Sequence, residues 1–270
     1  MNKRMVALWT LLLFCLARWI PAFAWEAPCF QEKPDWQYAD EERRIQIKKI
    51  SDGAVTYFVA DVQLKDVSGF HTELSSGLAS VSDLATQANA VLAINGDDYG
   101  THKYGVIIRN GKLLRAHDTT RNLLAVDANG DLHVKADRKN EDGKALGKQL
   151  VDAGVWQTFE FGPALVKDGQ AIDFSPDFDV ISTKASRLEP RTAIGQIGTL
   201  HYLLIVVDGR QEGYSVGMSL PDLQRLFISY GAKNALNLDG GGSAEMWFQG
   251  RILSSPSGGK ERCVSDILWF

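Results

Sequence analysis

Residues 237–247 read NLDGGGSAEMW, and this stretch decides how the C-terminal part of the chain folds. An Asn and an Asp flank an apolar residue, three glycines follow, and a Ser and a Glu stand just beyond. Three consecutive glycines lose much conformational entropy on folding and add nothing to a core. They let a ligand approach the backbone closely and leave amide N–H groups free to face an anion. Alone, the glycines are typical of a structural turn; beside carboxylates at a sheet edge they favour a binding turn.

The residues before this stretch predict a strand, a helix and a second strand. The apolar run 202–207 predicts a buried strand that stops at Asp208, and Ser219 can cap a helix with one apolar face. Residues 235–238 then predict a short strand that ends at Asp239. Two such strands are expected to be parallel neighbours, about 4.8 Å apart. Asp208 and Asp239 would then share the sheet edge at which α/β sheets bind ligands.

The remaining chain predicts short strands, Gly-rich turns and one further helix. Strands at 44–50 and 54–61 are expected to form a hairpin, and residues 78–90 a helix. A buried strand at 90–94 is expected to end at Asn95, near the same site. Hairpin signals stand at 110–111, 129–130 and 168–169. We therefore expect a single α+β domain over residues 25–270, with a mixed β-sheet, flanking helices and a C-terminal βαβ unit.

The first 24 residues resemble an export signal. Two basic residues precede a short apolar run, and Ala22-Phe23-Ala24 offers a cleavage site. The apolar run is too short to span a membrane, and no later stretch could do so. A periplasmic or secreted location follows as the expectation, with no stable membrane insertion.

The net charge limits the classes of partner, and the cysteines bear on disulfide formation. Without the signal the chain keeps 26 basic and 33 acidic residues, a formal charge of −7, which argues against nucleic acid or anionic lipid as a general partner. Cys29 and Cys263 remain, and in an oxidising compartment they can join. The alternative is two unrelated buried thiols. The oligomeric state is left open.

Six segments together resemble the phosphodiester glycosidase family, whose animal member is the uncovering enzyme. They span most of the mature chain, and the paired DGR and LDGGGS elements are the specific ones. The segments are AINGDDYG (93–100), FGPALVKDG (161–169), EPRTAIG (189–195), VVDGRQEGYSVGMSLPDL (206–223), ALNLDGGGSAEMW (235–247) and ERCVSDIL (261–268).

The resemblance implies a hydrolase that cleaves the glycosidic bond of a sugar-1-phosphodiester and releases a phosphomonoester. Glycoside hydrolysis commonly uses two carboxylates, for which Asp208 and Asp239 are the candidates, with Glu245 in reserve. Arg210 and Arg191 suit the leaving phosphate through bidentate contacts. The expected substrate-binding residues are Asn95, Gly96, Arg191, Asn237, Gly240, Gly241, Gly242 and Ser243, with Asp208, Asp239, Arg210 and Glu245 as the catalytic set.

Each candidate also has a purely structural interpretation. Asp208 can simply end a strand with Arg210 as its ion-pair partner, and Arg191 can pair with Glu189. Asp97 and Asp98, which depart from the family's usual residues, can be loop residues or can join the other carboxylates around Ca²⁺ or Mg²⁺. No cofactor is otherwise expected.

Two functions are therefore weighed. The first is an exported carbohydrate hydrolase acting in envelope or exopolysaccharide metabolism on a sugar-phosphate or glycan substrate. The alternative is a non-catalytic periplasmic module that binds a phosphorylated or acidic glycan through the same cleft.

Overall fold

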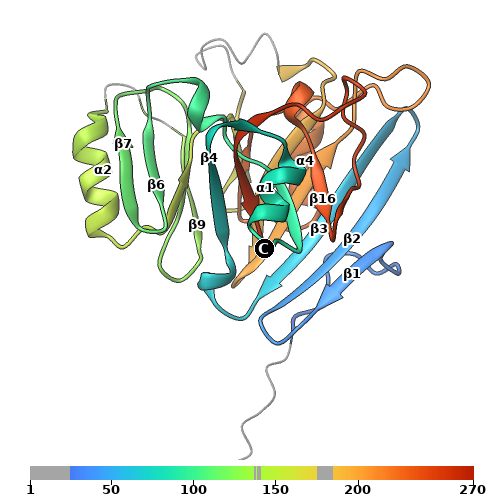
Figure 1. Cartoon of the computed structure of the whole chain (residues 1–270), viewed down its shortest axis with the longest axis horizontal. Coiled ribbons are helices and arrows are strands. Elements are labelled where there is room, and N and C mark those ends of the chain that lie inside the picture. Colours follow the sequence, from blue (N-terminus) through green and yellow to red (C-terminus); the bar gives the residue numbers. More distant parts are fainter. Residues whose placement is uncertain (1–24, 137, 139–140, 175–184) are drawn as a thin grey trace, which may run out of the picture.

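The computed structural model describes residues 25–136, 138, 141–174 and 185–270, so the expected export signal lies outside the described residues (Figure 1). Two stacked sheets dominate these residues. The eight-stranded sheet has the order β1 (Trp36–Ala39), β2 (Arg43–Asp52), β3 (Val55–Leu64), β14 (His201–Val207), β13 (Arg191–Gly198), β15 (Asn234–Asn237), β11 (Ala164–Lys167) and β12 (Gln170–Ala171). The five-stranded sheet has the order β17 (Arg251–Ile252), β16 (Met246–Phe248), β5 (Leu92–Asn95), β18 (Val264–Trp269) and β4 (His71–Ala79).

Smaller sheets and three helices complete the domain. A three-stranded sheet has the order β10 (Gln157–Phe159), β8 (Leu123–Val126) and β9 (Leu132–Lys135), and β6 (Val106–Arg109) pairs with β7 (Lys112–Ala116). The described helices are α1 (Val81–Gln87), α2 (Gly143–Asp152) and α4 (Leu220–Ser229), with short 3₁₀ turns η1 (Val67–Gly69), η2 (Tyr99–Thr101) and η3 (Gly241–Ser243). This mostly β architecture with peripheral helices agrees with the expected α+β class.

The main core lies between the two large sheets. Phe58 and Leu204 of the eight-stranded sheet belong to one buried cluster with Ile94 and Leu268 of the five-stranded sheet. Helix α4 covers the other face of the eight-stranded sheet, where Phe227 packs in a second cluster. Helices α1 and α2 cover two smaller clusters at the front and left edge of Figure 1. Burial of apolar surface on both sides therefore fixes how the sheets stack.

Local sequence signals explain many of the boundaries. The side-chain hydroxyls of Ser80 and Ser219 accept hydrogen bonds from the backbone amides of Asp83 and Asp222, and so cap the N-termini of α1 and α4. The expected hairpin between the strands at 44–50 and 54–61 is present as β2–β3. The expected turns at 110–111, 129–130 and 168–169 join β6–β7, β8–β9 and β11–β12.

The expected mixed sheet is wrong, because every strand pair in the described residues is antiparallel. Strands β14 and β15 are not neighbours: each pairs antiparallel with β13, which lies between them. They consequently run in the same direction and end at the same edge, but two strand spacings apart, about 10 Å instead of 4.8 Å.

The expected Cys29–Cys263 disulfide is absent, and both thiols are free. Cys29 packs with the cluster under α4, where its amide donates to Asp61 of β3, and Cys263 is exposed just before β18. Cys29 therefore packs against the eight-stranded sheet, whereas Cys263 adjoins a strand of the five-stranded sheet. No helix among the described residues is long and apolar enough to cross a bilayer.

Candidate functional site

Two of the three glycines, Gly240 and Gly241, are required by the packing and backbone of the turn that follows β15. A Cβ on Gly240 would lie 2.7 Å from the carbonyl oxygen of Pro190, and Gly241 has a left-handed φ of +60°. The Gly241 amide donates to that same Pro190 carbonyl at 2.9 Å. The turn is thus pressed against the start of β13, which only residues without a side chain allow.

Asp239 stands at the start of this turn with a half-buried side chain. Burial raises the pKa of the Asp239 carboxyl group, and the nearby charge of Asp98 raises it further. Hydrogen bonds from Ser243 and from the Gly240 amide, with the positive charge of Arg262, act in the opposite direction. Asp239 is therefore a partly desolvated acid that donors hold in a defined orientation.

Two guanidinium groups flank the turn. A Cβ on Gly241 would lie 3.2 Å from the Arg210 guanidinium, and one on Gly242 would lie 3.3 Å from the Arg262 side chain. Arg210 is half exposed and is held by Glu189, its Nε 2.5 Å from the carboxylate. Arg262 is exposed. The alternative interpretation, in which Arg210 pairs with Asp208, does not hold, because Arg210 pairs with Glu189 and lies over the glycine turn.

Asp208 is buried in a network that anchors the loop after β14. Its carboxylate accepts hydrogen bonds of 2.8 Å from the Tyr214 hydroxyl and from the Ser255 amide, and only 1% of the residue is exposed. Burial raises the pKa of Asp208, while these two donors and Lys49 lower it. Asp208 shares an edge with Asp239, as expected, but its oxygens are occupied by protein donors.

Arg191 also faces the protein more than the turn. Its Nε donates to the Met218 carbonyl at 3.0 Å and its Nη2 to the Arg187 carbonyl at 2.9 Å. Burial lowers the pKa of Arg191 to about 10, with Glu189 raising it and Arg210 lowering it. The alternative interpretation, an ion pair between Arg191 and Glu189, is replaced by these carbonyl contacts, although the charge of Glu189 still raises the pKa of Arg191.

Asn95 and Asn237 are buried at the ends of their strands. The Asn95 amide donates to the Asp239 carbonyl at 2.6 Å, and its oxygen accepts from the Thr192 hydroxyl at 2.7 Å and from the Glu245 amide at 3.2 Å. Asn95, which precedes Gly96, thereby joins the two sheets at the turn. Asn237 donates to the Gly162 carbonyl at 2.8 Å. Both side chains build the site from beneath.

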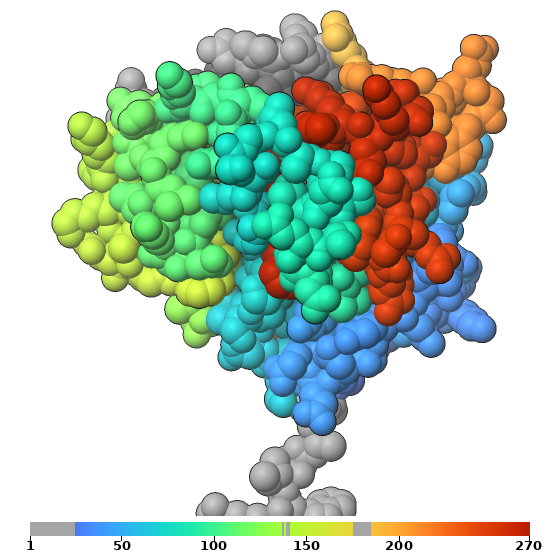
Figure 2. Space-filling model, viewed as in Figure 1, coloured from blue at the N-terminus to red at the C-terminus, as the bar shows by residue number. Residues whose placement is uncertain are grey.

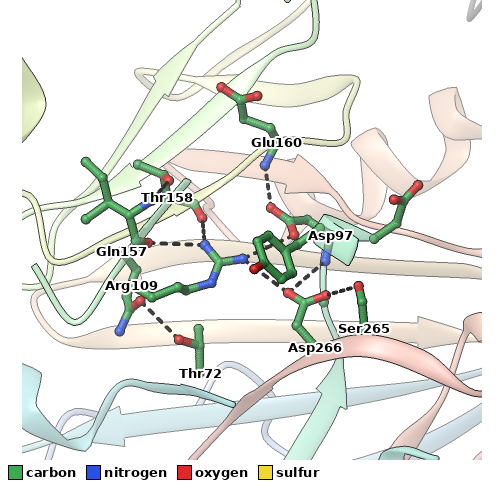
Figure 3. A network of polar contacts seen from close by, with 12 residues as sticks. Thr72, Asp97, Arg109, Gln157, Thr158, Glu160, Ser265 and Asp266 are labelled. Atoms are coloured by element: carbon green, nitrogen blue, oxygen red, sulfur yellow. Dashed lines mark hydrogen bonds and ion pairs between the residues drawn. The ribbon is translucent and has the colours of Figure 1, made fainter. Parts of the chain in front are cut away.

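Asp97 belongs to a buried ionic network shown in Figure 3. Its carboxylate lies 3.1 Å from Arg109 and accepts a 2.8 Å hydrogen bond from the Glu160 amide, and Arg109 also contacts Asp266 at 3.1 Å. Burial raises the pKa of Asp266 to about 7, with the charge of Asp97 acting in the same direction and Arg109 opposing it. The network ties the Asn95–Asp98 loop to β6, β10 and β18 and leaves Asp97 1% exposed.

Asp98, in contrast, is partly exposed. It has a left-handed φ of 67°, and its side chain is 18% exposed. Burial raises the pKa of Asp98 first, and Asp97 adds to that shift, while Thr101, Arg121 and Arg262 lower it. The charge of Asp98 in turn raises the pKa of Asp239. Among the described residues, no group of three or more His, Cys, Asp or Glu side chains could hold a metal ion.

Glu245 lies behind the turn beside Glu261. Glu245 is 2% exposed, and burial followed by its hydrogen bond and charge contact with Glu261 raises its pKa to about 9. Glu261 in turn accepts hydrogen bonds from the Ser82 amide at 3.0 Å and the Ser82 hydroxyl at 2.6 Å. The Glu245 carboxyl group is consequently protonated near neutral pH.

Sequence reasoning missed Arg262 and Glu261 as site residues. Both lie in the segment 261–268, which pointed to the family but carried no local signal of proximity to the glycine turn. In Figure 2 the C-terminal part of the chain, in red, lies against the teal segment that carries α1. Only this tertiary packing brings Arg262 to Gly242 and Glu261 to Glu245.

Comparisons with known proteins agree on the family. The family model described as phosphodiester glycosidase matches residues 88–270. The SPbeta prophage-derived uncharacterized protein YomE of Bacillus subtilis is 33% identical over 201 residues, 70% of this chain and 29% of that protein. The mouse N-acetylglucosamine-1-phosphodiester alpha-N-acetylglucosaminidase is 26% identical over 199 residues, 71% of this chain and 37% of the enzyme. The chain thus spans about a third of these relatives.

Solved structures show the same fold. The zebrafish N-acetylglucosamine-1-phosphodiester alpha-N-acetylglucosaminidase catalytic domain, auto-inhibited by its pro-peptide, aligns with a TM-score of 0.65 and 22% identity, over 85% of this chain and 82% of that one. A putative exported protein from Burkholderia pseudomallei aligns with a TM-score of 0.56 and 17% identity, over 81% and 74%. With the family model covering most of the described residues and the fold shared, the chain belongs to the phosphodiester glycosidase family.

Proposed function

We propose that this protein is a glycosidase that hydrolyses the bond between the anomeric carbon and the phosphate oxygen of a sugar-1-phosphodiester. One observation carries the proposal: the half-buried carboxyl group of Asp239 stands at a glycine turn that Arg210 and Arg262 flank. The reaction develops positive charge on the sugar, which a carboxylate can stabilise, and negative charge on the phosphate, which guanidinium groups can stabilise.

The charges follow from the bonds that change. Water adds to the anomeric carbon, the carbon–oxygen bond breaks, and the phosphate departs with the bonding electron pair as a phosphomonoester. Positive charge develops on the sugar, which an ionised Asp239 stabilises, and negative charge grows on the phosphate, which Arg210 and Arg262 stabilise. Because phosphate is a good leaving group, stabilising its charge matters more than protonating it.

The second carboxyl group in this proposal is Asp98. Its side chain is 18% exposed and the charge of Asp98 acts on Asp239, whereas Asp208 is 1% exposed and already accepts two protein hydrogen bonds. One of the two acids, Asp98 or Asp239, takes the proton that the attacking water loses, and the other faces the anomeric carbon. Asp208, expected from the sequence in this role, instead anchors the loop that carries Arg210.

The proposed setting is the cell envelope. Residues 1–24 have the pattern of an export signal, and the mature chain is acidic. A substrate in exopolysaccharide or other envelope metabolism would fit such a location. The mouse relative is named for its action on an N-acetylglucosamine-1-phosphodiester, which belongs to the proposed substrate class.

The test is phosphorus NMR of the purified mature protein with methyl diesters of several sugar-1-phosphates, with and without EDTA. Release of free sugar with methyl phosphate supports the proposal, and ¹⁸O from labelled water should appear in the sugar. Sugar-1-phosphate with methanol would mean cleavage at phosphorus and would contradict it. Binding of the diesters with no product after prolonged incubation would favour the non-catalytic glycan-binding module. Loss of turnover in EDTA would require a metal.

A further inference from the structure

A third guanidinium group lies beside Asp98, at Arg121. Its guanidinium lies between two aromatic rings, 4.8 Å from the centre of Tyr104 and 5.1 Å from that of Phe161. The side chain is 27% exposed. Stacking on two rings holds a guanidinium in one orientation while leaving its N–H groups at the edge, which suits recognition of an anion.

The hydrogen bonds around His102 leave Arg121 without a good acceptor. The Nε2 atom of His102 lies 3.4 Å from the Asp98 carboxylate, and Nδ1 lies 3.3 Å from Nη1 of Arg115. Burial, with the charges of Arg121 and Arg115, lowers the pKa of His102 to about 4, so the ring is neutral at pH 7 and has one N–H. A neutral imidazole accepts at one nitrogen only, and the tautomer with its N–H on Nε2, the nitrogen beside the Asp98 carboxylate, accepts at Nδ1 from Arg115.

In that tautomer the 3.4 Å approach of Arg121 Nη1 to Nε2 is not a hydrogen bond, because both groups are donors. Arg121 then retains only a charge contact of 3.9 Å with Asp98. Arg115 differs, since it donates to the backbone carbonyls of Tyr99 at 2.9 Å and Tyr104 at 3.1 Å. Among the described residues, no other acceptor meets the Arg121 guanidinium, so its donors are available to a ligand.

This position adjoins the proposed reaction centre. The charges of Arg121 and Arg262 both act on Asp98, and that of Asp98 acts on Asp239. Asp98 therefore links the two places: its carboxylate lies 3.9 Å from Arg121, and its charge acts on Asp239 at the glycine turn. A substrate whose scissile phosphate meets Arg210 and Arg262 would extend past Asp98 to reach Arg121.

We propose that Arg121, clamped between Tyr104 and Phe161, binds a second phosphate in the leaving group of the substrate. The inference rests on the proposed function and narrows it to substrates that carry two phosphates. Nucleoside diphosphate sugars and glycans with repeated phosphodiester links share this chemistry. In the first, the second phosphate is adjacent to the scissile one; in the second, a polyol separates the two.

The test compares three substrates of one sugar: the 1-phosphate methyl diester, the uridine diphosphate sugar, and a 1-phosphoglycerol diester with a terminal phosphate. The wild-type protein should show a higher kcat/KM for one or both substrates with two phosphates. Arg121→Gln should lower kcat/KM for these at least about tenfold, mainly through KM, because charged hydrogen bonds contribute about 1.5–3 kcal/mol. It should change the methyl diester less than about twofold, and Arg121→Lys should restore part of the loss. Arg225→Gln, at an exposed arginine on α4, is the matched control and should leave all three rates unchanged.

Two results would overturn the inference: an equal fall for all three substrates, or an unchanged preference in Arg121→Gln. A binding measurement separates it from the proposed function. Calorimetry with UDP and UMP measures binding without turnover. It therefore tests the second-phosphate site for nucleotides even if the protein cleaves none of the three substrates. Tighter binding of UDP that is lost in Arg121→Gln would then support the second-phosphate site while the hydrolase assignment fails. Equal binding of the two nucleotides by both proteins, with no response of the phosphoglycerol diester to Arg121→Gln, would contradict the site.

Discussion

The side-chain amide of Asn95 donates a 2.6 Å hydrogen bond to the backbone carbonyl of Asp239 and so joins the ends of β5 and β15, which belong to different sheets. The same side chain accepts hydrogen bonds from Thr192 and from the Glu245 amide. The buried Asn95 side chain therefore fixes the position of the glycine turn, and of the Asp239 carboxyl group, relative to the core.

Replacement of Asn95 by Ala should destabilise the fold and misplace Asp239 together. The change leaves buried polar groups without partners, which costs about 1–3 kcal/mol of unfolding free energy. Urea denaturation and turnover of the methyl diester measure the two effects. Asn129→Ala, at an exposed hairpin turn, should alter neither. A stable but inactive Asn95→Ala protein would indicate a direct role of Asn95 in substrate contact.

Asp239→Asn and Asp208→Asn should have different effects. Asp239→Asn should lower kcat at least about 100-fold with little change in melting temperature, because the half-buried acid acts on substrate. Asp208→Asn should lower the unfolding free energy by about 1–3 kcal/mol. The carboxylate accepts hydrogen bonds from two donors, and the NH₂ group of an asparagine would face one of those donors with a second donor. Asp152→Asn on the exposed end of α2 is the control. If Asp208→Asn abolished turnover at full stability, Asp208 would return as the second catalytic carboxylate.

Gly241→Ala tests the contact between the turn and Arg210. A methyl group there would lie 3.2 Å from the guanidinium and would also occupy a φ of +60°. Gly213→Ala is the matched control, because it has a φ of +76° and open space around the added carbon. Both should lose about 1–2 kcal/mol through backbone strain. Only Gly241→Ala should raise KM for the phosphodiester, and equal kinetics in both variants would contradict the phosphate role of Arg210.

The carboxyl pair Glu245–Glu261 predicts a pH dependence of stability. The pKa of Glu245 rises from 4.5 to about 9 on folding, chiefly through burial and next through Glu261. Between these values the folded chain holds a proton that the unfolded chain has released, so the wild-type unfolding free energy should fall as pH rises from about 5 to 9. Glu245→Gln keeps a donor toward Glu261 but has no acidic proton. The melting temperature of the variant, relative to that of the wild type, should therefore increase as pH rises. Exposed Glu212→Gln is the control. Parallel curves of melting temperature against pH for all three proteins would rule out a proton held by Glu245 in the folded chain.

Local signals in the sequence were sufficient for many elements. The serines at 80 and 219 cap helices, and the Asn-Gly at 110–111 makes the turn that such a pair favours. These features depend on residues a few positions apart, which is why the chain alone reveals them. The family and the position of Asp239 at the end of a strand followed from the same short-range patterns.

The order of the strands in the sheet could not be predicted from such local signals. A strand–helix–strand pattern between β14 and β15 favours parallel neighbours, but β13 enters between them and pairs with both. Antiparallel pairing with a strand that precedes both along the chain satisfies the same backbone groups, and residues 191–198 carry no mark of that choice. The distance between Asp208 and Asp239, and hence their separate surroundings, depended on it.

The sequence by itself determined that a carboxylate and a glycine turn follow a short strand, because glycine's freedom and strand-ending residues are local properties. Only the tertiary structure decided which charges surround that carboxylate. Arg262, Asp98 and Arg121 come from three separate segments, and burial then shifts the pKa values of the acids that they face. Electrostatic interaction depends on distance in space and on the exclusion of water, and neither quantity is written in the spacing of residues along a chain.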